Sequence, residues 1–197
     1  MRSDYIKKDA LENLLAAMPV KNALAVRLSL ETGMRVGDCV SLRWANFKGQ
    51  TITYTAQKTG KTDKKKITKP LLQLLQQYGG DDFVFASTRS KNGHIARQTV
   101  YRALKKAARL AGVTANVTPH SARKIYAVEM RDKVGIKETQ RLLQHTSPEV
   151  TALYAMSDVA LGGTISAAEF DRLVEIIASR TAQKVVKALF KSKKKPS

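Results

Sequence analysis

Arginine, lysine, histidine and tyrosine recur in short segments of this chain that could together build a site for an anion. Arg35 lies in TGMRVGDCVSLRW (32–44), at a break between two expected helices, and Asp38 follows three residues later. Lys58 projects from the turn QKTGK (57–61). Taken singly, each is also typical of an ordinary surface, where such cations are solvated or ion-paired.

Two further segments supply histidine and tyrosine. In TPHSARK (118–124), Pro119 opens a helix whose first turns place His120 and Arg123 at i and i+3, on one face. This pair favours an anion site, and a helix-capping histidine is the alternative interpretation. In LLQHTSPEVTALY (142–154), His145 precedes Tyr154 by nine residues.

The composition narrows the class of partner. Among 197 residues, 35 Lys and Arg stand against 16 Asp and Glu, a formal net charge of +19, while 43% hydrophobic residues suffice for a core. This charge indicates a polyanionic partner, with nucleic acid ahead of an anionic membrane surface. A single cysteine, Cys39, and three histidines predict neither a disulfide nor a zinc site. Without an apolar run or a signal peptide, we expect a cytoplasmic, reduced protein.

The elements that must position these residues are mainly helical. Pro19 and Gly33 bracket a dense apolar segment, and the alternation in TITYTAQ followed by KTGK predicts a hairpin. Apolar periodicity predicts helices at 7–17, 20–32, 36–43, 70–78, 98–111, 119–131 and 136–143, a short helix from Ser147 carrying Tyr154, and strands at 51–57 and 64–68.

A last helix is expected after a connector of small residues (159–164). Ser166 and Glu169 form a capping-box pattern, and the apolar stripe that follows must pack on its own domain or on a neighbouring molecule. The terminal KSKKKPS is expected to be a solvated basic tail.

In their order along the chain, these residues resemble the catalytic domain of the tyrosine recombinases, the phage integrase family. The resemblance covers about residues 20–160 and includes TGMRVGDCVSLRW and STR (87–89). The chain departs from the family pattern at Ala122, Lys124 and Gln144, and we expect the N-terminal core-binding domain to be missing.

The resemblance implies an α+β fold, mainly α with a small antiparallel sheet, known as the tyrosine recombinase or DNA breaking-rejoining enzyme fold. It implies a catalytic domain at 1–160, and a linker, C-terminal helix and basic tail at 161–197.

The resemblance also assigns roles for breaking and rejoining DNA strands. Tyr154 would attack the scissile phosphate to form a 3′-phosphotyrosine, and Arg35 and Arg123 would hold its non-bridging oxygens. Lys58 would be the general acid, His120 would assist proton transfer, His145 would donate a hydrogen bond, and Asp38 would support Arg35 or its helix. No metal and no cofactor is needed, because cationic side chains supply the charge.

The expected partner is double-stranded DNA, with no membrane involved. The resemblance implies a homo-tetramer on two DNA sites, with the C-terminal helix exchanged between protomers, for integration or excision of a mobile element in the nucleoid. The lysines expected to contact DNA are Lys61, Lys64, Lys65, Lys66 and Lys124.

Three alternatives remain at this level. A type IB topoisomerase-like enzyme shares the tyrosine chemistry but reseals the same strand. A non-catalytic DNA-binding module would use only the basic faces. A metal-dependent nuclease is the most distant, because the sequence shows no compact carboxylate cluster.

Overall fold

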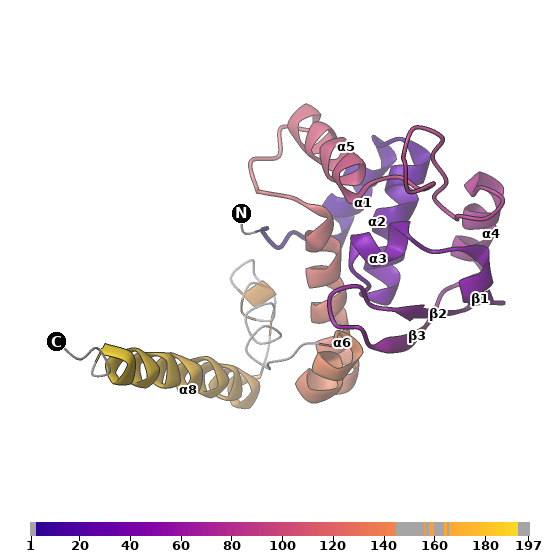
Figure 1. The fold of residues 1–197 in the computed structure, drawn as a ribbon. Helices are drawn as coiled ribbons and strands as arrows, with labels where there is room; N and C mark the ends of the chain where they lie inside the picture. Colours follow the sequence, from indigo (N-terminus) through magenta and orange to yellow (C-terminus); the bar gives the residue numbers. More distant parts are fainter. Residues whose placement is uncertain (1–2, 145–155, 157, 160–163, 165, 193–197) are drawn as a thin grey trace. The chain divides into compact units, whose positions relative to one another are not determined.

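The computed structural model describes residues 3–144, 156, 158–159, 164 and 166–192, and the chain divides into two compact units, residues 1–126 and 127–197 (Figure 1). Each unit is described by itself below. Because residues 160–163 and 165 lie outside the described part, the expected domain boundary near residue 160 stays a prediction.

The first unit is built around helix α2. Its helices are α1 (Lys8–Ala16), α2 (Val20–Thr32), α3 (Val36–Val40), α4 (Lys69–Tyr78), α5 (Arg97–Leu110) and the start of α6 (Pro119–Leu142). Helix α2 contacts α1, α3, α4 and α5, which explains why Leu24, Ala25, Val26, Leu28 and Leu30 are all buried. It begins after Pro19 and ends at Gly33, whose φ of 70° is the left-handed conformation that glycine adopts most readily.

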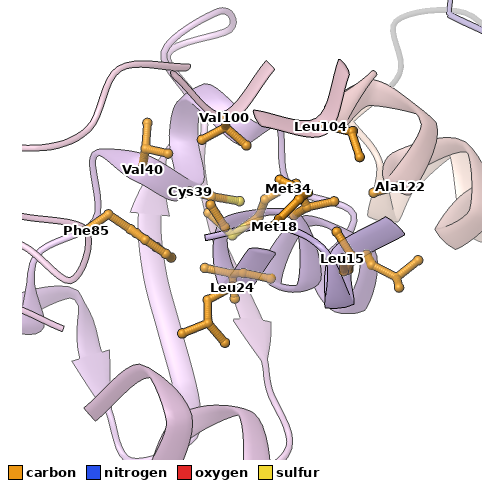
Figure 2. Close-up of a cluster of buried hydrophobic side chains, with 14 of the residues drawn as sticks. Leu15, Met18, Leu24, Met34, Cys39, Val40, Phe85, Val100, Leu104 and Ala122 are labelled. Carbon is orange, nitrogen blue, oxygen red and sulfur yellow. The ribbon is translucent and has the colours of Figure 1, made fainter. Parts of the chain in front are cut away.

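The core of this unit is apolar and continuous. Figure 2 shows Leu24 of α2, Met34, Cys39 of α3 and Val100 of α5 in the same cluster. Cys39 is fully buried, and this burial is the main cause that raises the pKa of its thiol. Cys39 is therefore a small side chain of the core.

A three-stranded antiparallel sheet flanks the helices, in the order β1 (Phe47–Lys48), β2 (Thr51–Thr55) and β3 (Thr62–Lys66). A short 3₁₀ helix, η1 (Trp44–Asn46), precedes it. Ile52 and Tyr54 of β2 are buried, and the register places Lys65 opposite Ile52. The loop between β2 and β3 spans residues 56–61 and carries Lys58.

The structure confirms the predicted class, mainly α with a small antiparallel sheet. It also shows where local patterns misjudged element ends. Helix α3 ends at Val40 rather than near residue 43, because Arg43 is extended, with φ −106° and ψ 158°, and forms an antiparallel bridge with Phe83. Strand β3 starts at Thr62 rather than 64, where the hydroxyls of Thr55 and Thr62 hydrogen-bond at 3.0 Å.

The second unit contains the rest of α6, residues 156 and 158–159, and α8 (Ala167–Ser192). Gly135, with φ 78° and ψ 170°, interrupts α6, which agrees with the two separate helices predicted at 119–131 and 136–143. The Ser166 hydroxyl accepts the amide of Glu169 at 3.2 Å, as the capping pattern predicts. Within the described residues, no helix is both long and apolar enough to cross a membrane.

Candidate active site

Arg35 owes its position to the break between α2 and α3. Gly33 ends α2 in the left-handed conformation, and Arg35 is extended, with φ −69° and ψ 140°, at the residue before α3 begins. The backbone therefore turns at this point, and the half-buried Arg35 side chain lines a pocket.

Asp38 ties α3 to the hairpin loop. Its side chain is buried, and its Oδ1 accepts the backbone amide of Gln57 at 3.0 Å. Its Oδ2 is buried without a hydrogen-bond partner in the described part of the chain. The carboxylate thus holds the loop one residue before Lys58, a contact between segments that the sequence did not indicate.

Lys58 lies on the exposed outer side of that loop. The loop closes on itself, because the Ala56 carbonyl accepts the amides of Thr59 at 3.1 Å and Gly60 at 2.8 Å. Gly60 has φ 67°, a conformation that favours glycine. A compact loop anchored at its base carries the lysine, which keeps the freedom of an exposed side chain.

His120 and Arg123 come from the first turns of α6. His120 is exposed, whereas Arg123 is only 3% exposed, and its Nη1 donates to the carbonyl of Gly33. Gly33 therefore serves twice: it ends α2 ahead of Arg35 and its carbonyl accepts from Arg123. A guanidinium held in this way is ordered before any ligand arrives, which reduces the entropy lost on binding.

These side chains meet in one pocket of about 530 Å³, inside the first unit. Arg35, Lys58, His120 and Arg123 all line it, although 88 residues separate the first from the last in sequence (123 − 35). Asp38 lines it as well. His145 and Tyr154 lie outside the described residues, so their roles stay predictions.

The electrostatics of the pocket favour an anion. Partial desolvation, followed by the charges of Arg123, Lys124, Arg35 and Lys58, lowers the pKa of His120 from 6.5 to about 4. The ring is therefore neutral near pH 7, so one ring nitrogen can accept a proton while the other donates a hydrogen bond, and the tautomer decides which nitrogen does which. A bound phosphate would offset the repulsion between the cations that the fold brings together in this pocket.

Arg97 also lines this pocket and was not among the predicted site residues. It is the first residue of α5, where the predicted helix began one position later, and its side chain is exposed. A basic residue at a helix start was the only local signal. The tertiary fold brings that helix end to the pocket.

The lysines expected to contact DNA differ in exposure. Lys61, Lys64 and Lys66 are exposed on the hairpin. Lys65 is buried and its Nζ lies 3.0 Å from Asp63 Oδ2, and Lys124 is buried with its Nζ donating to the Ser3 carbonyl. DNA contact by the five lysines stays a prediction, and their exposure makes Lys61, Lys64 and Lys66 the ones best placed for phosphate contact without a rearrangement.

Trp44 and Phe47 pack within the protein. Their ring centroids lie 5.2 Å apart, and Trp44 Nε1 donates to the Gly80 carbonyl at 2.6 Å. Both rings pack against the buried core.

The chain is similar to proteins of a known family. The family model described as the phage integrase family matches residues 4–160. A curated tyrosine recombinase of Thermosipho africanus is 27% identical over 163 residues, covering 77% of this chain and 56% of that protein. The chain spans about half the length of the curated relatives that it matches.

Solved structures share the fold. The chain matches a lambda integrase dimer bound to a COC′ core site with a TM-score of 0.71 and 22% identity, covering 85% of this chain and 52% of that one. It matches a lambda integrase tetramer bound to a Holliday junction with a TM-score of 0.67 and 23% identity, over 78% and 48% of the two chains. The expected tyrosine recombinase catalytic-domain fold is thus confirmed.

Proposed function

Because this chain belongs to the phage integrase family, we propose that it is a site-specific DNA recombinase that cleaves and rejoins strands through a tyrosine. The observation that carries the proposal is the convergence of Arg35, Lys58, His120 and Arg123 on one pocket. The tyrosine recombinase of Thermosipho africanus and the lambda integrases bound to DNA support the same activity.

In the proposed reaction, the Tyr154 oxygen attacks the scissile phosphorus and the bond to the 5′ oxygen breaks. The product is a 3′-phosphotyrosine and a free 5′ hydroxyl, and the reverse attack by a 5′ hydroxyl reseals a strand without ATP. In each transesterification, one bond from phosphorus to oxygen forms as another breaks, so the energy of the phosphodiester is retained.

The pocket residues supply the charge and the protons. Arg35 and Arg123 bind the non-bridging oxygens, where forked donors fit a phosphate and stabilise its developing charge. Lys58 gives a proton to the departing 5′ oxygen, a role that suits an exposed side chain on a loop anchored by Asp38. Neutral His120 assists the transfer of the phenolic proton of Tyr154 as the oxygen attacks. His145 donates a hydrogen bond to the phosphate. Because the cations neutralise the phosphate, the mechanism needs no metal.

We propose double-stranded DNA as the substrate and a homo-tetramer on two DNA sites as the active assembly, as the lambda integrase tetramer on a Holliday junction suggests. The exposed lysines of the hairpin would hold the phosphate backbone, in the nucleoid of the cytoplasm. The apolar stripe of α8 supports exchange of this helix between protomers, because Phe170 and Val174 are 40% and 42% exposed while Leu173 is buried. The reaction would integrate or excise a mobile element.

Covalent trapping tests the proposal. The protein is incubated with EDTA and a pool of duplexes of randomised sequence, each nicked one nucleotide past the cleavage position so that the leaving fragment diffuses away. After denaturation, we expect a protein–DNA adduct from the wild-type chain and from Tyr126→Phe, which changes a buried tyrosine, but none from Tyr154→Phe. An adduct that survives Tyr154→Phe would refute the assignment of the nucleophile.

The role of Lys58 has its own test. A 5′-bridging phosphorothiolate leaves as a thiolate, whose conjugate acid is far stronger than an alcohol, so no general acid is required. Lys58→Ala is therefore expected to react slowly on ordinary DNA and at the wild-type rate on the sulfur-substituted DNA. Equal slowing on both substrates would show that Lys58 binds the phosphate rather than protonates the leaving oxygen.

Relaxation of a supercoiled plasmid lacking a second site would indicate topoisomerase activity instead of recombination.

A further inference from the structure

Arg131 is a buried cation among the described residues of the second unit. It lies on α6, and its side chain is 1% exposed. Its Nε donates to Asp132 Oδ1 at 2.6 Å, its Nη2 donates to Asp158 Oδ2 at 3.4 Å, and its Nε lies 3.7 Å from Glu169 Oε1. One guanidinium therefore joins three segments: α6 itself, the chain around residue 158, and the first turn of α8.

The three carboxylates differ in what they can hold. Asp132 is adjacent in sequence and 56% exposed, so it fixes nothing beyond α6. The Glu169 carboxylate is 33% exposed and makes an ion pair at 3.7 Å. Asp158 is 16% exposed and accepts a hydrogen bond from across 27 residues, so it is the most buried of the three and a long-range partner. Because a buried charge that loses its partner is costly, this pair resists separation.

An apolar contact reinforces the same segment. Ile136 and Leu173 are buried together, with Met156, Ile176 and Ile177 packed against them. Met156 and Asp158 thus anchor their short stretch of chain through two different kinds of contact. The stretch is held to α6 by a charge pair and to the apolar face of α8 by packing.

This stretch directly follows the proposed nucleophile. Tyr154 precedes Met156 by two positions and Asp158 by four. Because an extended residue spans at most about 3.5 Å, a link of two to four residues ties the proposed nucleophile closely to whatever holds Met156 and Asp158. Attack on phosphorus needs accurate placement of the oxygen, and a misplacement of about 1 Å can cost about 100-fold in rate.

We infer that Arg131, through Asp158, is a positioning residue for the tyrosine of the strand-cleavage reaction, an inference that rests on the proposed function. The guanidinium does not touch the phosphate. It holds the chain after Tyr154 against α6, so that the nucleophile samples fewer positions. Since Glu169 of α8 pairs with the same guanidinium, the position of the last helix also affects this anchor.

The test separates the rate of adduct formation from DNA affinity. Arg131→Gln and Asp158→Asn are each expected to slow adduct formation on the nicked duplexes by about 10- to 100-fold, while the DNA dissociation constant stays within about twofold. The double variant should be no slower than either single one, because the two residues act as a pair. Arg131→Lys, which keeps the charge, should recover part of the rate. Lys133→Gln removes an exposed charge from the same helix and should react like the wild type.

Several outcomes would overturn the inference. They are a wild-type rate in Asp158→Asn, additive effects in the double variant, or a slower rate that parallels equal losses of DNA affinity and thermal stability. If Arg131→Gln fails to fold, Asp158→Asn alone decides, because it leaves the guanidinium its other carboxylates.

A second readout keeps the inference distinct from the proposed function. If the wild-type chain forms no adduct, the proposed function fails. Chymotrypsin, which cleaves after tyrosine and leucine, then reports on the anchor alone. We expect faster cleavage after residues 153 and 154 in Asp158→Asn than in Lys133→Gln. Equal cleavage rates would show that the Arg131–Asp158 pair does not anchor this segment.

Discussion

The pKa of His120 offers a quantitative check on the pocket. Desolvation and then the charges of Arg123, Lys124, Arg35 and Lys58 lower this pKa to about 4. At pH 6, about 1% of His120 would carry a proton, against about three-quarters for a histidine with an ordinary pKa of 6.5. The difference is large enough to measure on the protein without DNA.

The assay follows the Cε1 proton of His120 by nuclear magnetic resonance between pH 3 and pH 8. The chain has three histidines, so His120→Gln identifies the resonance. We expect a midpoint near 4 in the free protein. Lys58→Met should raise the midpoint, because it removes one of the four repelling charges, whereas Lys48→Met on β1 should leave it unchanged.

The sign of the pH dependence follows from linkage. A histidine whose pKa is lowered by folding is protonated more readily in the unfolded chain, so its contribution to stability is complete above pH 6.5 and declines as the pH falls toward 4. His120→Gln should therefore flatten the loss of stability across this window. A bound phosphate must raise the midpoint, and by reciprocity phosphate or DNA must bind better as His120 protonates. A midpoint near 6.5 in the free protein, unchanged in Lys58→Met, would refute the reasoning.

Three further predictions concern the hairpin and its supports. Lys64→Ala should reduce the slope of log affinity for DNA against log salt by about 0.9, while buried Lys65→Ala should leave the slope unchanged; equal slopes would contradict the preference for exposed lysines. Asp38→Ala should lower the free energy of unfolding by about 1–3 kcal/mol in urea titrations, because it removes the buried acceptor of the Gln57 amide in the hairpin loop; no change would contradict the role of this hydrogen bond. Gly33→Ala should cost about 1–2 kcal/mol at its left-handed φ, whereas Gly37→Ala, whose new Cβ meets only ordinary contact at 3.9 Å, should not; similar costs would contradict this assignment.

Local signals in the sequence were sufficient for much of the fold. Pro19 and Gly33 bracket α2 at the predicted residues, because proline and glycine restrict or permit the backbone independently of distant contacts. The hairpin followed from β-branched alternation and a turn containing Gly60. The order of six residues identified a family, namely Arg35, Lys58, His120, Arg123, His145 and Tyr154. The structure brings the first four side chains to one pocket.

Tertiary contacts decided what no local pattern encodes. The register of β3 on β2 turns Lys65 inward, opposite Ile52, while its neighbours Lys64 and Lys66 stay exposed, although the three lysines are consecutive in the sequence. Arg97 reached the pocket only because α5 packs with its first turn beside it. Nothing in the local sequence distinguishes Arg131 from a solvated surface cation. The farthest of its carboxylate partners, Glu169, follows it by 38 positions (169 − 131). Sequence by itself determined which residues are present and which helices and turns they favour locally. Which charges are buried, and against which partners, depended on contacts between distant segments, since burial is a property of the packed chain.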